Sequence, residues 1–338
     1  MSENASSKDF NVIGLNAHSI YEGIGRYAQL VEQIIGSENF ISFILDKRKR
    51  GQKFIGNIVN GVYPPISNGW FLNLIRAERH FRRLKTSSLY HSMSPIIVPD
   101  VAKIVTVHDI DYLNNFKTKF IHEQMKKRLF NAITKKTILT VSKRSYESLI
   151  EYGASEVKLI ELCALPVFRK LSVSIESLRV KYGIPLEKKI VLTVGHGKTE
   201  LVQKASEING YYHVHVGDGP ADLSIYRPDN IQLNEIYNCS DVFVRITDVE
   251  GFGSPAMEAM TVGIPIVVSD IQTYRDIYGE SAVYAESNVY SISNGLKEAL
   301  TNGCELVSNF NKLREYYSFE RFKKEMIKFY TDVGNSTQ

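Results

Sequence analysis

Residues 241–270, DVFVRITDVEGFGSPAMEAMTVGIPIVVSD, decide the fold of the second half of the chain. They begin with an apolar strand that ends near Ile246, continue through a loop that contains two glycines, and then form a helix. We expect Ser254 to cap that helix, with Pro255 in its first helical position. Because backbone N–H groups at a helix start bind anions, this loop is predicted to hold a diphosphate.

Two carboxylates accompany the loop. Glu250 precedes the helix and Glu258 lies about one turn inside it. The two side chains could therefore reach different parts of one ligand and accept hydrogen bonds from its vicinal hydroxyls. A surface loop with a capped helix would explain either glutamate alone, because carboxylates favour a helix N-terminus. The combination of glutamates, glycines and helix start favours a ligand site.

Apolar strand-like runs alternate with amphipathic helical runs on both sides of this stretch, a pattern typical of parallel α/β layers. The expected strands are 10–15, 40–45, 88–91, 103–108, 137–141, 189–194, 211–216, 242–246 and 266–269. The expected helices of the first half are 24–35, 70–84, 119–132 and 143–152. We predict two Rossmann-like doubly wound domains, residues 1–165 and 166–318. Ligands of such sheets bind at the carboxyl ends of the strands, so we expect the site in a cleft between the domains.

Composition is that of a water-soluble α/β protein, with 338 residues, 43% of them hydrophobic and 23% charged. No apolar run reaches the roughly 18 residues that a membrane-spanning helix needs. The three cysteines are far apart and include no C-x-x-C pair, so neither a disulfide framework nor a zinc site is predicted. The polar N-terminus does not resemble a secretory signal, and we expect a cytoplasmic protein.

The net charge of +4 is spread unevenly, because residues 1–165 carry +8 and residues 166–338 carry −4. The first half is therefore expected to face something anionic. Segments 70–85 and 117–136 hold much of this positive charge. Segment 70–85 is either a core-packed helix with a solvated basic face or a helix that contacts anionic lipid or a phosphorylated acceptor. No aromatic residues interleave a basic groove, so nucleic acid is not an expected partner.

Two pairs of histidines need separate interpretation. His213 and His215 alternate along one strand and share a face, but a metal site needs more ligands than these two, so no metal site is predicted. His108 and His91 each end a predicted strand. A histidine at a strand end is more often structural, and His91 is as consistent with that as with a place on the acceptor side of a site.

The run EGFGSPAMEAMTVGIPIV resembles the signature of the large retaining glycosyltransferase family known as family 4, which has the GT-B fold. The hallmark of that family is two glutamates separated by seven residues, here Glu250 and Glu258. The resemblance covers nearly the whole chain, since GIGRYAQLVEQI, VTVHDIDYL, VGDGP and IYGESAVY follow in the family's order. It implies two Rossmann-like domains that face a central cleft, and a last helix, within residues 319–338, that crosses back to the first domain.

The resemblance also implies roles for single residues. Glu250 would bind hydroxyls of the donor sugar, and Glu258 would hold the ribose of the nucleotide. Backbone amides would approach the sugar and the diphosphate at the glycines and the phenylalanine of two loops: Gly23, Gly25, Gly251, Phe252 and Gly253.

Further roles concern histidines and cations. His108 would lie near the sugar, with Asp109 in support. Family members usually carry an Arg and a Lys after the first strand of the second domain, whereas this chain has a shorter loop there with His196 in the place of the Arg. Lys198 is the expected phosphate contact, and Lys204 is an alternative.

The implied activity is transfer of a hexose of mannose or glucose type from a UDP- or GDP-sugar to a hydroxyl acceptor, with retention and without a bound metal or cofactor. The acceptor would be a glycan, a lipid-linked sugar or another hydroxyl compound, which fits a protein peripheral to the inner face of a membrane. Because the phosphate-binding loop departs from the family pattern, a catalytically weak subunit that only binds nucleotide sugars is the alternative.

Overall fold

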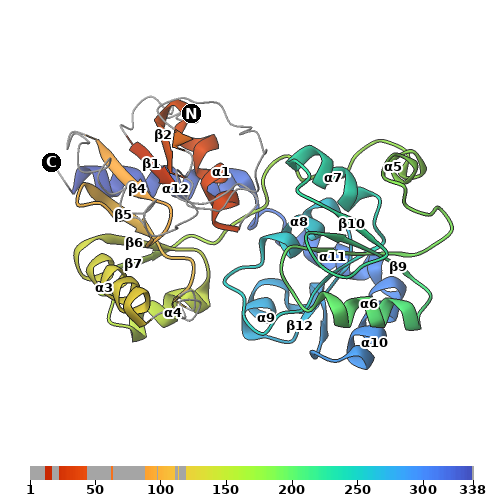
Figure 1. Cartoon of the computed structure of the whole chain (residues 1–338). Coiled ribbons are helices and arrows are strands. Elements are labelled where there is room, and N and C mark those ends of the chain that lie inside the picture. The colour runs from red at the N-terminus through yellow and green to blue at the C-terminus, as the bar shows by residue number, and fades with distance from the viewer. Residues whose placement is uncertain are drawn as a thin grey trace. The chain divides into compact units, whose positions relative to one another are not determined.

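The computed structural model describes residues 12–16, 23–43, 62–63, 88–96, 98–110, 113 and 119–336 (Figure 1). The chain divides into two units, Met1–Leu162 with Phe322–Gln338, and Cys163–Arg321. The sequence placed the first boundary at residue 165 and the start of the last segment at residue 319. Both boundaries in the structure lie within three residues of those positions.

The first unit contains a parallel sheet in the order β3-β2-β1-β4-β5-β6-β7. Its strands are β1 Val12–Asn16, β2 Phe40–Phe43, β3 Val62–Tyr63, β4 Leu89–Ser92, β5 Ala102–Thr106, β6 Thr137–Thr140 and β7 Val157–Leu159. Its helices in the described residues are α1 Gly23–Ile35, α3 Lys119–Lys135 and α4 Lys143–Glu151, together with most of α12 Phe319–Asn335. The chain thus returns to its first unit in its last helix, which Figure 1 draws in blue among red and orange elements.

The second unit repeats this topology with the strand order β10-β9-β8-β11-β12-β13, again all parallel. Its strands are β8 Ile190–Val194, β9 Tyr212–Val216, β10 Leu223–Ile225, β11 Val242–Arg245, β12 Ile266–Ser269 and β13 Val283–Ala285. Its helices are α5 Ile175–Tyr182, α6 Thr199–Ile208, α7 Asn230–Asn238, α8 Ser254–Val262, α9 Gln272–Tyr278, α10 Val289–Thr301 and α11 Gly303–Leu313. Strand order reverses between β8 and β11, which is where such sheets bind ligands.

The doubly wound α/β fold expected from the sequence is confirmed in both units. Each expected strand is present, with ends within two residues of those predicted. The edge strands β3, β7, β10 and β13 were not predicted, because two or three residues are too few to show a periodic pattern. The expected helix 70–84 lies outside the described residues.

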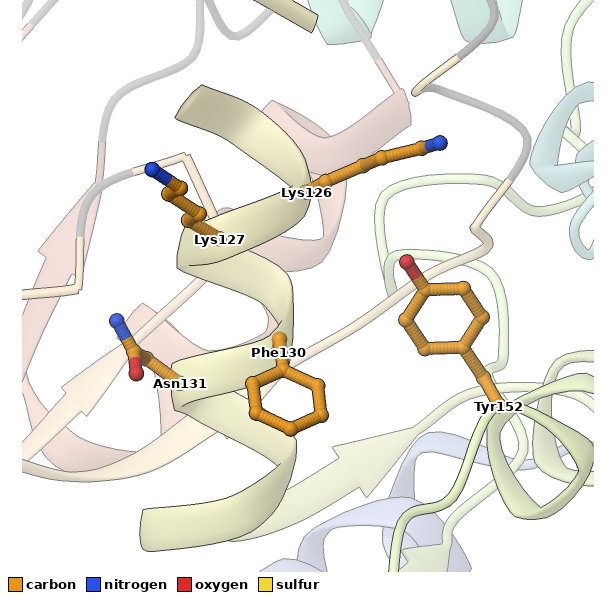
Figure 2. Close-up of a pocket in the computed structure, with 5 residues that line it drawn as sticks. All are labelled: Lys126, Lys127, Phe130, Asn131 and Tyr152. Atoms are coloured by element: carbon orange, nitrogen blue, oxygen red, sulfur yellow. The ribbon is translucent and has the colours of Figure 1, made fainter. Parts of the chain in front are cut away.

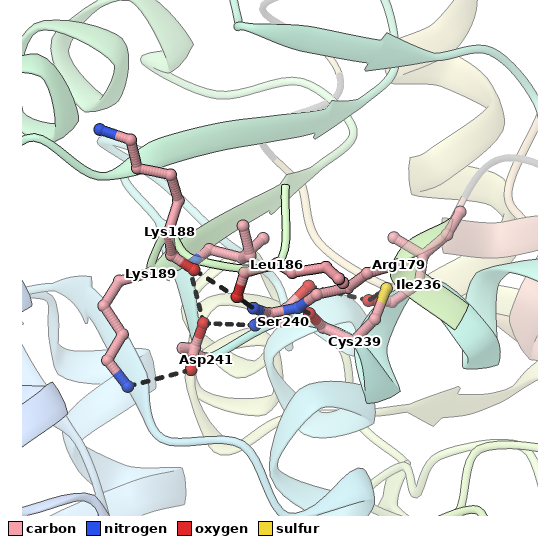
Figure 3. A network of polar contacts seen from close by, with 9 residues as sticks. Arg179, Leu186, Lys188, Lys189, Ile236, Cys239, Ser240 and Asp241 are labelled. Atoms are coloured by element: carbon pink, nitrogen blue, oxygen red, sulfur yellow. Dashed lines mark hydrogen bonds and ion pairs between the residues drawn. The ribbon is translucent and has the colours of Figure 1, made fainter. Parts of the chain in front are cut away.

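A buried arginine fixes the amino ends of β8 and β11 (Figure 3). Arg179 of α5 donates from Nη2 to Asp241 Oδ2 at 2.7 Å, and from Nε to the Cys239 carbonyl at 3.0 Å. Its Nη1 donates to the carbonyls of Leu186 and Lys188, both at 3.2 Å. Asp241 Oδ2 also accepts the backbone N–H of the first residue of β8 at 2.7 Å. Removing water from this guanidinium is tolerable because its donors are paired.

A buried polar chain holds α12 against the first sheet. His91 of β4 bonds to Tyr330 of α12 through Nδ1 at 2.8 Å and to Thr106 Oγ1 of β5 through Nε2 at 2.7 Å. Tyr27 of α1 bonds to the same Thr106 oxygen at 2.8 Å. His91 is fully buried, and this burial, with the nearby charge of His108, lowers its pKa to about 3. The neutral ring of His91 therefore joins β4 to β5 and α12, and Thr106 extends the chain of hydrogen bonds to α1.

Lowering the pH should consequently destabilise the first unit. The unfolded chain binds a proton at His91 below about 6.5, whereas the folded chain excludes that proton until about pH 3. Lowering the pH from 6.5 therefore favours unfolding, by up to about 1.4 kcal/mol per pH unit. We expect His91→Gln to be less stable than the wild type at pH 7.5 and less sensitive to acid between pH 6.5 and 5. Urea unfolding at both pH values checks this, and parallel pH dependences of the two proteins would contradict it.

Candidate functional site

The loops that follow β8 and β11 lie at the switch point of the second sheet. Because β8 and β11 are neighbouring parallel strands, their carboxyl ends meet at the same edge. The backbone N–H of Lys198, after β8, donates to the carbonyl of Ile246, after β11, at 2.9 Å. Gly195 has a positive φ of 73°, which lets the chain turn sharply out of β8. The two loops therefore form one structure.

Glu250 is the best-held carboxylate of these loops. Arg245, the last residue of β11, donates to Glu250 Oε2 from Nε at 3.0 Å and from Nη2 at 2.9 Å. The hydroxyl of Tyr274 on α9 donates to the same oxygen at 3.3 Å. The Arg245 and Glu250 side chains are only 15% and 19% exposed. The carboxylate is thus fixed by donors from a strand and a helix.

Arg245 also reaches the other loop. Its Nη1 donates to the carbonyl of Val194 at 3.3 Å and to the carbonyl of His196. Burial lowers the pKa of Arg245, but its interactions with Glu250 and Tyr274 more than offset this, so the pKa lies above its usual value. The sequence interpretation missed Arg245. Its signal was a single cation at the end of an otherwise apolar buried strand, VFVR.

The two candidate lysines differ in their surroundings. Lys198 precedes α6 at the loop junction, and its ammonium group pairs with Asp248 in the loop after β11. Lys204 lies within α6 and pairs with Glu200 one turn earlier at 2.8 Å, on the exposed surface. Of the two, Lys198 is the one that lies among the residues around Glu250. His196 is exposed, and its carbonyl rather than its ring makes the contact with Arg245.

The start of α8 differs from the expectation. The N-cap residue is Gly253, and Ser254 is the first helical residue, so the prediction of a Ser254 cap is wrong. Gly253 has a φ of 86°, and a Cβ atom there would lie 2.5 Å from Cε1 of Tyr274. The chain turns into α8 against the Tyr274 ring, which leaves room for no side chain. Gly251 and Phe252 precede this turn, and the Phe252 side chain is buried 6.3 Å from the ring of Tyr317.

Glu258 lies one turn into α8 and is only 2% exposed. Its Oε2 accepts a hydrogen bond from the hydroxyl of Tyr237 on α7 at 2.9 Å. The two glutamates therefore have different partners. Glu250 is held by a guanidinium at the loop, and Glu258 is held by a phenol beneath the helix start.

The histidines of β9 share one hydroxyl. Thr193 Oγ1 lies 2.8 Å from both His213 Nε2 and His215 Nδ1. Gln203 Oε1 lies 2.8 Å from His213 Nδ1 and, as an amide oxygen, can only accept a hydrogen bond from it. Thr193 therefore donates a hydrogen bond to His213 and accepts one from His215. Burial, with the nearby charge of His215, lowers the pKa of His213 to about 4. Within the described part of the chain, no three His, Cys, Asp or Glu side chains are grouped to hold a metal ion.

The other predicted residues belong to the first unit. Gly23 and Gly25 form the first turn of α1, and Gly25 is buried. His108 lies two residues beyond β5, half-buried, with Nε2 3.1 Å from the carbonyl of Met93. Asp109 follows it and is also half-buried. A place for His91 on the acceptor side of the site is ruled out, because a fully buried ring with both nitrogens hydrogen-bonded cannot line an acceptor surface.

The first unit also has a groove beside α3 (Figure 2). It has a volume of about 360 Å³ and is lined by Lys126, Lys127, Phe130, Asn131 and Tyr152. Phe130 is 57% exposed. Two cations and two aromatic rings thus share one open surface. The other basic segment, residues 70–85, lies outside the described residues.

Known proteins share both the sequence pattern and the fold of this chain. Residues 224–317 match the family model for glycosyl transferases group 1. A 119-residue segment is 24% identical to TuaC of Bacillus subtilis (strain 168), described as a teichuronic acid biosynthesis glycosyltransferase, and the match covers 31% of each chain. Sucrose-phosphate synthase from Thermosynechococcus elongatus is 15% identical with a TM-score of 0.70, covering 96% of this chain and 99% of that one. Anabaena HepE in complex with UDP-glucose is 11% identical with a TM-score of 0.74, covering 95% and 99%.

The turn at Gly253 gives a test of how Tyr274 is held. Alanine at Gly253 would be strained by its positive φ and would also push Tyr274 away from Glu250. Gly263 has a φ of 94°, and a Cβ atom added there would have no neighbouring atom within 4 Å, so it is the matched control for backbone strain alone. We expect Gly253→Ala to lower the free energy of unfolding by at least about 1 kcal/mol more than Gly263→Ala, since overpacking adds to strain. Urea unfolding checks this, and equal losses would mean that the Tyr274 ring yields freely.

Proposed function

We propose that this protein is a retaining hexosyltransferase that uses a nucleotide-diphosphate sugar. The reasons are that residues 224–317 match the family model for glycosyl transferases group 1 and that the chain has the GT-B fold. The family and the fold that the sequence predicted are thereby confirmed. The proposal rests on one observation above all. Glu250, fixed by Arg245 and Tyr274, lies at the sheet's switch point just before the N-terminus of α8.

The diphosphate, the sugar and the ribose of the donor would each bind to a different part of the site. The N-terminal N–H groups of α8 favour the diphosphate, and the loop glycines let the backbone approach it. Glu250 would accept hydrogen bonds from sugar hydroxyls. Glu258, kept in place by Tyr237, would accept them from the ribose. The HepE structure is a complex with UDP-glucose, which supports a UDP-hexose donor for this protein. A GDP-hexose has the same diphosphate and ribose, so both donors are candidates.

The reaction would proceed on one face of the sugar. The bond between the anomeric carbon and the phosphate oxygen breaks as the acceptor oxygen attacks from the same side, and the acceptor proton passes to the departing phosphate. Lys198 would stabilise the charge that develops on the diphosphate, so that no metal is required. Glu250 already accepts three hydrogen bonds from protein donors, which suits a binding group better than a nucleophile. From the first unit, the backbone at Gly23 and Gly25 would approach the diphosphate. His108, supported by Asp109, would approach the sugar.

The proposal predicts different defects for the two glutamates. Glu258→Gln should weaken binding of the bare nucleoside diphosphate by roughly 10-fold or more, since hydrogen bonds to charged groups contribute about 1.5–3 kcal/mol. Glu250→Gln should leave that affinity within about threefold and lower turnover by about 100-fold, as loss of one preorganised polar group does. Calorimetry with UDP and GDP and assays of nucleoside diphosphate release measure both.

Glu298→Gln, an exposed carboxylate of α10, is the matched control and should change neither quantity. Equal loss of diphosphate affinity in both site variants would refute the division of roles. A wild-type protein that binds the diphosphate but releases none from any UDP- or GDP-hexose with an acceptor would instead be the binding subunit.

We further propose that the acceptor is presented at an anionic surface, such as that of a membrane. Among the residues that the structure describes, no helix is long and apolar enough to cross a bilayer. The α3 groove offers Lys126, Lys127 and the exposed Phe130, which can join electrostatic to apolar contact with lipid. The net charge of +8 in residues 1–165 has the sign that attracts an anionic surface.

This proposal can be tested by vesicle co-sedimentation. The wild type should bind vesicles with anionic lipid more than neutral ones, and less as salt rises because screening shortens electrostatic attraction. The double variant Lys126→Ser, Lys127→Ser should weaken this binding several-fold. The triple variant with Ser at Arg79, Arg82 and Arg83, in the other basic segment, should do the same. Lys297→Ser, on the second unit, is the control and should bind as the wild type does. No preference for anionic vesicles would refute the proposal.

A further inference from the structure

Arg245 is an unusual residue for its place. The other three residues of β11 are buried and apolar, and β11 is a central strand of its sheet. A guanidinium that is only 15% exposed is costly to hold away from water unless its donors are satisfied. Its donors reach Glu250, Val194 and His196. The charge is therefore retained at a site where an apolar side chain would be the simpler solution.

Three protein donors meet one oxygen of Glu250. Nε and Nη2 of Arg245 and the hydroxyl of Tyr274 all donate to Oε2. These donors come from the end of β11 and from α9, so together they fix the direction of the carboxylate.

Arg245 joins Glu250 to the loop after β8. Its Nη1 lies between the carbonyls of Val194 and His196, and a Cβ atom on Gly197 would be 3.5 Å from it. The next residue of this loop is Lys198, whose backbone is bonded to Ile246. A displacement of the guanidinium would thus change both the direction of Glu250 and the path of the loop that carries Lys198.

A second buried ion pair lies at the opposite ends of the same two strands. Arg179 and Asp241 are 10% and 22% exposed, close to the values for Arg245 and Glu250. That pair clamps β8 and β11 at their amino ends. The Arg245 pair clamps them at their carboxyl ends, where parallel α/β sheets bind ligands.

We propose that Arg245 is a positioning residue, which holds the Glu250 carboxylate directed at the donor sugar and couples it to the loop that carries Lys198. The inference deepens the proposed function and rests on it. Arg245 acts through Glu250, so its loss should affect the step in which the sugar is transferred more than the binding of the nucleotide.

Three variants test this proposal. Arg245→Met removes the charge, Arg245→Lys keeps the charge but cannot form the same set of bonds, and Arg179→Met breaks the matched pair at the other end of the strands. The measurements are UDP and GDP affinity, and kcat and KM for the donor. Unfolding is followed for each variant so that rates refer to folded protein.

For Arg245→Met we expect a fall in kcat of about 100-fold, with nucleoside diphosphate affinity within about threefold of the wild type. Arg245→Lys should have an intermediate kcat. Arg179→Met should be less stable, with kcat and KM unchanged.

The double variant Arg245→Met with Glu250→Gln distinguishes action through Glu250 from any separate effect. If Arg245 acts through Glu250, the double variant should be no slower than Glu250→Gln alone, because the two losses are not additive. Multiplied losses, or a folded Arg245→Met with the kcat of the wild type, would overturn the proposal. If Arg245→Met does not fold, an Arg245→Lys variant with wild-type kcat overturns it.

Failure of the proposed function gives a different result. In that case the wild type itself would release no nucleoside diphosphate from any UDP- or GDP-hexose.

Discussion

The half-buried carboxylate of Glu250 determines how the carboxyl edge of the second sheet is built. A charge in such a place must be paired and hydrogen-bonded, because the cost of removing it from water otherwise exceeds what folding can supply. Arg245 supplies the cation from the end of β11, and Tyr274 supplies a hydroxyl from α9. The Tyr274 ring can pack here only because Gly253 has no side chain. The start of α8 and the placement of α9 thus both depend on the partners of one carboxylate.

Two buried ion pairs hold opposite ends of β8 and β11. At the amino ends, Arg179 bonds to backbone carbonyls and to Asp241, and all these contacts serve the chain itself. At the carboxyl ends, Arg245 bonds partly to backbone and partly to Glu250. A buried pair contributes little net stability, so under the proposed function the retention of Arg245 is better explained by the direction it gives to Glu250.

The sequence predicted the fold well because strands buried on both faces are continuous apolar runs, as in IVLTV of β8 and IVVS of β12. It predicted Glu250 and Glu258 because their spacing around two glycines is a local pattern. It could not predict that Arg245 approaches Glu250, since this contact depends on how the loop folds back against β11. The Ser254 cap failed for a related reason. The positive φ of Gly253 makes the glycine itself the helix boundary, and the packing of Tyr274, 21 residues later, requires that glycine.

Two histidines of the first unit show how the end of a strand decides whether a side chain is buried. His91 is within β4, so its ring enters the core, where Thr106 and Tyr330 satisfy both nitrogens and burial keeps it neutral. His108 is two residues past the end of β5, so its ring lies at the edge of the sheet, half-buried against Tyr27 at 4.8 Å. Both appeared as strand ends in the sequence, and a difference of a few residues in where the strand stops separates them. A side chain becomes available to a ligand in this fold only after the backbone has left the sheet, which holds equally for Glu250 beyond β11.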